Sequence, residues 1–386
     1  TRRDPEINVL SRRQRQELEQ LEKIIEDKES RQTADPNPEL LAEIKTAKAT
    51  RDKLKKAKRR TMITRATKPR VTRILPRGDW LDESGPVVEP AIPSFMGKIA
   101  SEKRLSRLDL ANWLTDAEKG AGKLTARVLA NRLWYLLFGQ GLSPDLTDFG
   151  GQGQPPDHPE LLDNLAMCLL EKEWSIKALL KEIVVSRSYR QAAATEKNIA
   201  NFQKISRLPA ESIRDNALAI SGLLVHDVGG ASIKPYQPAG YFRHLNFPTR
   251  KYAHHKDQRQ WRRGVYIHWQ RQFLHPMLKA FDAPRREECT AQRPRSNTPL
   301  AALVLLNDPT FIQAAEAFAK RILESGGSST ESRLEFAFRH AVSRKPDDFE
   351  RKTLKNLLSS KDSNENGKWT TVARAILNLA ETNLRR

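Results

Sequence analysis

The chain has 386 residues, of which 67 are Lys or Arg and 47 are Asp or Glu, giving a formal net charge of +20. A chain of this length can bury a large core and is expected to form two or three domains. Two cysteines, Cys168 and Cys289, exclude a disulfide-rich scaffold and a four-cysteine zinc site. No apolar run reaches the roughly 18 residues of a membrane-spanning helix.

The first residues of the chain do not indicate the cellular compartment of the protein. The first residue is Thr1, and nothing near it has the pattern of a secretion signal. We therefore expect a processed chain or a piece of a longer protein. There is also no C-x-x-C-H motif, so we predict no haem and no other cofactor in this chain.

The positive charge is concentrated in two segments. Residues 51–77 contain many lysines and arginines with Asp52 as the one acidic residue, and residues 243–295 are also strongly basic. Such blocks create local positive fields that attract polyanions. The segment 51–77 contains no aromatic residue on which bases could stack, so nucleic acid is the least favoured partner, and a solvated helix end followed by an extended strap is the simpler interpretation.

We predict a mainly α-helical protein in three parts. Helical spacing of leucines and isoleucines indicates a helical hairpin within 1–60, broken at Asp35-Pro36-Asn37-Pro38. Short β-branched runs between prolines indicate an extended basic linker over 61–104. The third part, 105–386, is predicted to be a multi-helix domain.

Within this third part, apolar periodicity, caps and first-turn prolines predict a series of helices. They cover 108–114, 124–138, 159–172, 176–187, 210–224, 299–306, 309–324, 331–342, 347–359 and 369–383. Between them lie a long Gly/Pro loop at 139–157 and an irregular region at 225–295, rich in aromatic, His and Arg residues. The run Gly264–Trp269 is predicted to be a strand.

Long stretches of the third part resemble one domain of unknown function from large planctomycete-type proteins. The most specific is FDAPRREECTAQRPRSNTPLAALVLLNDPTFIQAA at 281–315. The others are LDLANWL at 108–114, LTARVLANRLWYLLFGQGL at 124–142, 148–166, 174–191, ESIRDNALAISG at 211–222, 229–242 and ILNLAE at 376–381. The segment 61–93 resembles the linker to a companion domain upstream, whose tail would be the hairpin.

The resemblance implies a modest set of properties. Such proteins look exported or envelope-associated, so a periplasmic, secreted or cell-surface location is expected. They often carry a cytochrome-c-like domain, which suggests a redox context and a haem c in an upstream part. Relatives usually carry an acidic pair as Asn-Leu-Asp-Glu near the C-terminus, whereas here Ala380 precedes Glu381.

The segment 282–308 is the best candidate for a binding site. Arginines precede a predicted helix start, where free N–H groups and the helix dipole favour an anion. The candidate anion-binding residues are Arg285, Arg293, Arg295, Asn297 and Thr298. The alternative is that Asp282, Glu287 or Glu288 neutralises these arginines inside the protein.

Three further residues of this segment are candidates for chemistry. Asp282 and Asp308 could form a carboxylate pair, although a helix cap explains Asp308 fully. Cys289 lies among arginines that would lower its pKa if it were exposed. A buried, inert cysteine is the alternative.

One face of the helix 124–138 carries polar residues at a spacing of four and three. Arg127, Asn131 and Trp134 are expected to fix the 139–157 loop, with ligand contact as the alternative. His158 or the residue before it is expected to cap the following helix. Glu211, Arg214 and Asp215 are interpreted as an ion-pair cluster within one helix. No spacing of the eight histidines predicts a metal site.

These observations leave three functions open, and whether the protein is an enzyme stays undecided. The first is a scaffold that docks a redox or envelope partner. The second is an enzyme or binding module for an acidic polysaccharide, with its site between the 139–157 loop and 282–308. The third is nucleic-acid binding through 51–77.

Overall fold

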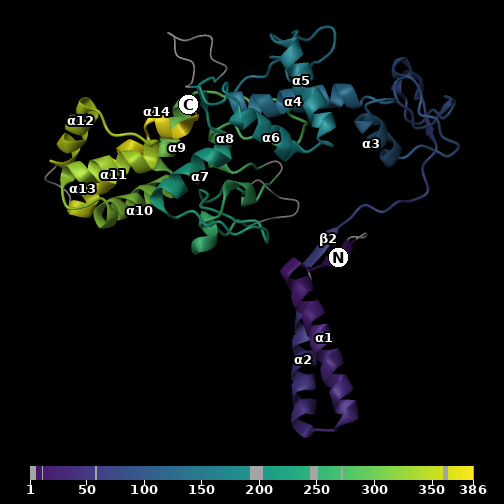
Figure 1. Cartoon of the computed structure of the whole chain (residues 1–386), viewed down its shortest axis with the longest axis horizontal. Helices are drawn as coiled ribbons and strands as arrows, with labels where there is room; N and C mark the ends of the chain where they lie inside the picture. Colours follow the sequence, from purple (N-terminus) through teal and green to yellow (C-terminus); the bar gives the residue numbers. More distant parts are fainter. Residues whose placement is uncertain are drawn as a thin grey trace. The chain divides into compact units, whose positions relative to one another are not determined.

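A computed structural model describes residues 6–10, 12–56, 59–191, 203–243, 251–270, 273–359 and 364–385. These residues form fourteen α-helices and three two-stranded sheets, which confirms the predicted mainly α class. Residue contacts divide the chain into two compact units, Thr1–Pro90 and Ala91–Arg386 (Figure 1). Each unit is described by itself.

The first unit contains the predicted helical hairpin. Its helices are α1 (Arg12–Ala34) and α2 (Pro38–Lys56), and β1 (Glu6–Val9) pairs antiparallel with β2 (Arg59–Met62). Only one isoleucine of each helix is buried, Ile25 and Ile44. Ion pairs such as Lys28–Glu43 at 2.6 Å also join the helices, but exposed pairs of this kind contribute little stability. The apolar stripe of the hairpin is therefore thin.

The linker is extended and contains little regular structure. β3 (Thr72–Arg73) pairs with β4 (Val87–Val88), and 3-10 turns lie at Pro76–Gly78 and Ser94–Met96. The frequent prolines cannot donate backbone hydrogen bonds, so the strands remain short.

The second unit begins with a small cluster of four helices. These are α3 (Arg107–Thr115), α4 (Gly122–Phe138), α5 (Pro159–Glu171) and α6 (Ile176–Val185). α4 packs on α5, and α5 packs on α6. Their shared core contains the fully buried side chains Phe138, Leu162, Leu169 and Leu179.

The remaining helices surround α10, which is the centre of a second, larger core. α10 packs against α7 on one side and α13 on the other, and Phe318 is fully buried between them. The helices are α7 (Ala210–Ser221), α8 (Pro276–Ala280), α9 (Pro299–Asn307), α10 (Pro309–Ser325), α11 (Thr330–Val342), α12 (Asp348–Leu358), α13 (Glu365–Leu377) and α14 (Ala380–Asn383).

Two details of the prediction are wrong in this region. The single helix predicted over 369–383 begins earlier and is interrupted between α13 and α14. The predicted strand Gly264–Trp269 is instead a 3-10 turn at Gly264–Tyr266 with one isolated bridge, Ile233 to Ile267. Gly264 lies so close to α7 that an added Cβ would approach the Glu211 Cα at 3.0 Å, so this segment packs on a helix rather than in a sheet.

The last strand connects the C-terminus with the middle of the chain. β5 (Ser206–Arg207) pairs antiparallel with β6 (Leu384–Arg385). The pairing places Arg207 and Arg385 next to the loop that follows α8, where the candidate site lies.

We expect Phe318→Ala to lower the free energy of unfolding by about 3–5 kcal/mol, because it leaves a cavity in the core around α10. Urea denaturation followed by circular dichroism measures the change. The matched control is Phe349→Ala on α12, whose side chain is 78% exposed and whose loss should cost less than about 0.5 kcal/mol. Equal effects of the two substitutions would contradict the assigned core.

Candidate functional site

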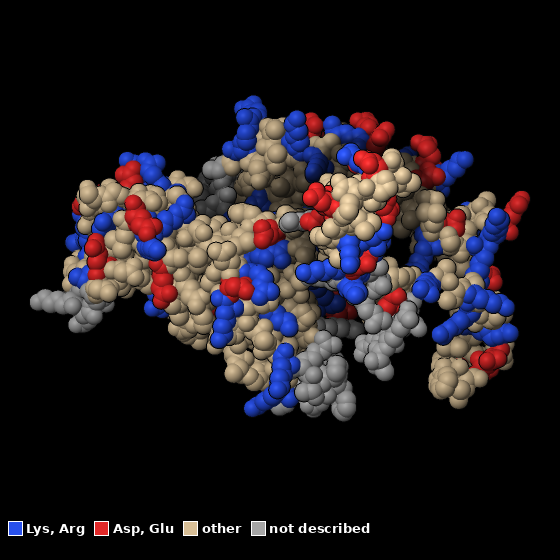
Figure 2. Space-filling model, turned by 90° about the horizontal axis from the view of Figure 1, so that it is seen from below, with Lys and Arg blue, Asp and Glu red and all other residues tan. Residues whose placement is uncertain are grey.

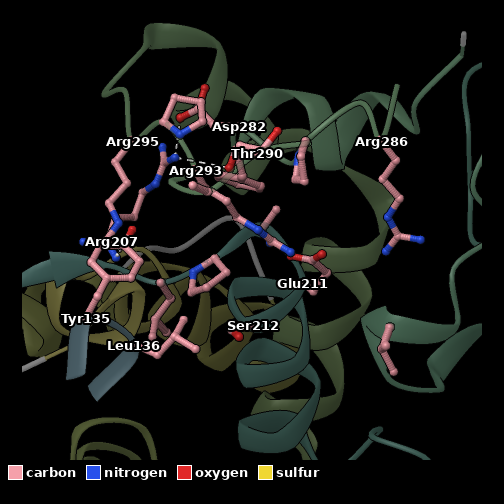
Figure 3. A pocket seen from close by; sticks show the side chains of 18 of the residues that line it. Tyr135, Leu136, Arg207, Glu211, Ser212, Asp282, Arg286, Thr290, Arg293 and Arg295 are labelled. Carbon is pink, nitrogen blue, oxygen red and sulfur yellow. Dashed lines mark hydrogen bonds and ion pairs between the residues drawn. The ribbon is translucent and has the colours of Figure 1, made fainter. Parts of the chain in front are cut away.

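A cavity of about 630 Å³, which we call the central cavity, lies in the second unit. Its walls come from the C-terminal half of α4, the segment 207–212 and the loop 281–295 (Figure 3). Five arginines and three carboxylates line it. These are Arg132, Arg207, Arg286, Arg293, Arg295, Glu211, Asp282 and Glu288.

Asp282 fixes the loop that forms one wall of the central cavity. Its backbone is left-handed, with φ 59°, and its carboxylate accepts hydrogen bonds from the Ser296 backbone N–H at 2.7 Å and from the Arg207 guanidinium. Burial alone would raise the pKa of Asp282, but the hydrogen bonds from Ser296 and Arg207 outweigh it and hold the pKa below its ordinary value. Both ends of the loop are thereby attached to β5.

Arg293 is neutralised, but by a carboxylate that the sequence does not suggest. Its Nη1 lies 2.8 Å from Glu211 Oε2, and the Glu211 side chain is 16% exposed. Glu211 is at the start of α7, far from Arg293 in the sequence, and Figure 3 shows the two side chains meeting below the loop. Arg293 therefore has little capacity left for a ligand.

Arg295 is in a different situation. Its guanidinium lies over the Tyr135 ring, 5.4 Å from the centroid, and donates to the Tyr135 hydroxyl at 3.3 Å. The side chain is exposed, and no described carboxylate forms an ion pair with it. Burial lowers the pKa of the neighbouring Arg385, and the charge of Arg295 lowers it further. An anion at this position would relieve the repulsion between these two guanidinium groups.

Arg132 and Arg286 are also exposed on the wall of the central cavity. Arg132 donates to the Ala291 carbonyl at 3.1 Å, and Arg286 lies over the Trp269 ring, 3.7 Å from its centroid. Neither forms an ion pair with a described carboxylate. Figure 3 places Arg286 on the opposite side of the cavity from Arg295. Arg285, next in the chain, is exposed and lines an adjoining cavity.

The helix start predicted to complete the anion site is occupied by its own cap. Thr298 accepts a hydrogen bond from the Ala301 N–H at 3.3 Å, at the start of α9. Neither Asn297 nor Thr298 is among the residues that line the central cavity. The charge available there therefore comes from guanidinium groups rather than from a helix terminus.

The other candidates of this segment lie apart. The Asp308 carboxylate caps α10 by accepting from the Thr310 N–H at 2.8 Å, whereas Asp282 is held by Arg207 and Ser296. The two aspartates therefore do not form the suggested carboxylate pair, because each carboxylate is bound by other groups. Cys289 is exposed at the tip of the loop.

The polar face of α4 holds the 139–157 loop. Asn131 is fully buried, donates to the Ser143 carbonyl at 3.0 Å and accepts from the Ser143 N–H at 2.9 Å. Arg127 forms an ion pair with Asp163 of α5 at 2.8 Å, and Trp134 stacks on Phe138. His158 is the residue before α5, in the N-cap position. Asn131 therefore fixes the loop as predicted, whereas Arg127 joins α4 to α5 and Trp134 packs against Phe138 of its own helix.

Glu381, the remaining member of the C-terminal acidic pair, binds an arginine. Arg344 contacts Glu381 at 2.6 Å and Glu350 of α12 at 2.6 Å. Glu381 therefore joins α14 to α12 and does not face the central cavity.

A buried polar centre lies below the irregular region, and the sequence does not reveal it. Arg214 is fully buried and donates to the Arg262 carbonyl at 2.8 Å, while the Asp215 carboxylate accepts from the Gly264 N–H at 2.6 Å. The predicted cluster within α7 is confirmed for Arg214 and Asp215, which lie 3.4 Å apart, but Glu211 pairs with Arg293 instead. Arg214 and Asp215 also tie α7 to the 260–264 turn. The sequence contains no signal for these contacts with the 260–264 turn, because the partners in the turn are backbone groups.

His275 belongs to the same centre. It is 3% exposed, and its Nε2–H donates to the Tyr236 carbonyl at 2.7 Å. Nδ1 is buried and has no partner among the described atoms. Burial lowers the pKa of His275 to about 4, because a protonated Nδ1 would be a buried donor without an acceptor. The nearby positive charge of Arg214 lowers the pKa as well.

The described residues contain no group of three or more His, Cys, Asp or Glu side chains placed to hold a metal ion. Among the same residues, no helix is both long and apolar enough to cross a membrane. Figure 2 shows lysine and arginine side chains interspersed with acidic ones on the face that it displays.

The family model described as PSD1, protein of unknown function (DUF1553), matches residues 106–358. Neither the curated proteins nor the solved structures gave a match. The matched region includes all residues of the central cavity.

We expect the free energy of unfolding to fall between pH 6.5 and about 4, by up to about 3 kcal/mol from His275 alone. In this range the unfolded chain protonates the histidine and the folded chain does not. Urea denaturation at several pH values measures the loss.

The His275→Gln variant should show a smaller loss over the same range. Burial raises the pKa of Asp215 and Asp308, which acts in the opposite sense, so the difference between variant and parent isolates the histidine. The exposed His226→Gln is the control. An unchanged pH dependence in His275→Gln would refute the assignment.

Proposed function

Since the chain belongs to the PSD1 (DUF1553) family, a family described as of unknown function, we propose a function from the central cavity: it binds the anionic group of an acidic glycan. Arg295 is the principal contact of the anionic group, and Arg132 and Arg286 are donors for hydroxyl groups elsewhere on the glycan. The chain would then be a glycan-binding module.

One observation carries the proposal. Arg295 is a guanidinium group at the wall of a cavity, held over the Tyr135 ring and without a carboxylate partner among the described residues. Guanidinium groups bind carboxylate or sulfate through two parallel hydrogen bonds. The stacking on Tyr135 restricts the side chain before a ligand arrives, which reduces the entropy lost on binding.

The size and polarity of the cavity favour a sugar over a small inorganic ion. Ligand pockets usually have volumes of about 300–1,000 Å³, and the central cavity has about 630 Å³. Its wall combines charged groups with Thr290, Ser212 and several prolines. Such a mixture suits a ligand with hydroxyl groups and apolar faces.

The other predicted functions have less support. Nucleic-acid binding through 51–77 has no stacking residue to accompany the charge. The scaffold role beside a redox or envelope partner, with its cytochrome-c association and planctomycete-type origin, stays a prediction from the resemblance. An exported location, which the same resemblance implies, would be compatible with a glycan ligand.

The test is isothermal titration with a disaccharide in which a uronic acid is linked to a neutral sugar. We expect Arg295→Ala to weaken binding by about 10- to 100-fold, which corresponds to the loss of a charge-assisted hydrogen-bonded pair. Raising the salt concentration should weaken binding of the disaccharide to the parent protein and have a smaller effect on its binding to Arg295→Ala.

Arg339→Ala is the matched control, since Arg339 is an exposed arginine of α11 that pairs with Glu335 at 2.8 Å. It should bind like the parent. The corresponding neutral disaccharide should bind the parent and Arg295→Ala equally weakly. The proposed function would be rejected if the parent bound no acidic saccharide, or if Arg295→Ala and Arg339→Ala bound the acidic disaccharide equally well.

A further inference from the structure

The wall of the central cavity contains apolar side chains as well as arginines. Leu136, Leu208 and Pro209 all line the cavity, and we call them the apolar corner. The Leu136 side chain is 57% exposed, although leucine is usually a buried residue. Pro209 is also exposed, and Leu208 is half-buried. The apolar corner therefore offers apolar surface to a ligand in the cavity.

Backbone contacts hold the two parts of the apolar corner together. Arg385 donates a hydrogen bond to the Leu136 carbonyl at 2.8 Å, and the β5–β6 pairing places Arg385 opposite Ser206. The Leu208 N–H donates to the Asn383 carbonyl at 2.9 Å. The end of α4 and the segment that follows β5 are thus both attached to the same C-terminal stretch of the chain.

The polar backbone groups of the apolar corner are already in use. The Leu136 carbonyl and the Leu208 N–H form the contacts just described, and Pro209 has no N–H. The Pro209 carbonyl accepts hydrogen bonds from the N–H groups of Ser212 and Ile213 at 2.9 and 3.0 Å. A sugar hydroxyl group placed against the corner would lose water and find these groups occupied, which costs free energy. A methyl group at the same place gains free energy from its burial.

The apolar corner lies next to the group that binds the acid. Leu136 directly follows Tyr135 in α4, and the Tyr135 ring lies under the Arg295 guanidinium. Figure 3 shows Leu136 beside Tyr135, on the side of the cavity that holds Arg295 and away from Arg286. A glycan whose acidic group binds Arg295 therefore places its neighbouring substituents at the apolar corner.

From this arrangement we infer that the glycan carries a methyl group on the sugar next to its acidic sugar, in an acetamido or a 6-deoxy substituent. The inference rests on the proposed function and adds a substrate class to it. Arg295 holds the acidic group, and the apolar corner selects the sugar that follows. A neutral sugar with a hydroxyl group at that position is the disfavoured ligand.

Isothermal titration of the full chain with three disaccharides tests the role of the methyl group. Each contains glucuronate in the same linkage to a second sugar, which is glucose, N-acetylglucosamine or 6-deoxyglucose. At least one of the two methyl-bearing disaccharides should bind about three- to tenfold tighter than the glucose disaccharide, because its methyl group leaves water. The affinities for N-acetylglucosamine and 6-deoxyglucose then identify the substituent.

Leu136→Asn tests the apolar corner, because it places a polar side chain of similar size at an exposed position. The variant should bind the three disaccharides with equal affinity. Leu124→Asn is the matched control, since Leu124 is a 43% exposed leucine of the same helix that does not line the central cavity. This control should keep the preference of the parent. Thermal unfolding verifies that both variants remain folded.

Arg295→Ala separates this inference from the proposed function. It should weaken binding of all three disaccharides by a similar factor and leave the preference for the methyl group unchanged. If the parent binds all three with equal affinity, or if the preference persists in Leu136→Asn, the inference is overturned while anion binding stands. If the parent binds none of the three, both fail.

Discussion

The attachment of Asp282 to Arg207 and Ser296 is the contact on which the site depends. A carboxylate that accepts hydrogen bonds from a guanidinium and from a backbone N–H holds the two ends of the loop 281–295 against β5. β5 in turn pairs with β6. Without this junction, the loop that carries Arg286, Arg293 and Arg295 would lose its attachment to β5.

The junction also explains why so many arginines can share one cavity. Arg207 and Arg293 are each neutralised by a carboxylate, from Asp282 and Glu211. The remaining guanidinium groups lie over aromatic rings or bind backbone carbonyls, contacts that orient the group without cancelling its charge. Some arginines are thus neutralised by carboxylates, and others are only held in position by rings and carbonyl groups. The arginines of the second kind keep their positive charge in the cavity.

Sequence patterns were sufficient for most helices of the second unit, because caps such as Ser175, Thr298 and Asp308 act within three residues of their own helix. They were not sufficient for the partners of the arginines. Glu211 and Arg293 are separated by 82 positions, and β5 pairs with a strand at the far end of the chain. Such contacts are fixed by tertiary packing, which local periodicity does not encode. The 264–269 segment was misassigned for the same reason, since Gly264 packs against α7 and Ile267 pairs with Ile233 in an isolated bridge instead of a strand.

The pairing of β5 with β6 has a practical consequence for expressing this domain. The family match ends at residue 358, yet α13 contributes Trp369 and Ile376 to the core around α10, and Arg385 donates to the Leu136 carbonyl beside Tyr135. A recombinant fragment cut at the limit of the match would lose the packing of α13 on α10 and the hydrogen bond of Arg385 to α4 beside the cavity. Domain limits drawn from sequence similarity therefore underestimate the folding unit here, and an autonomous fragment has to include the chain through Arg385.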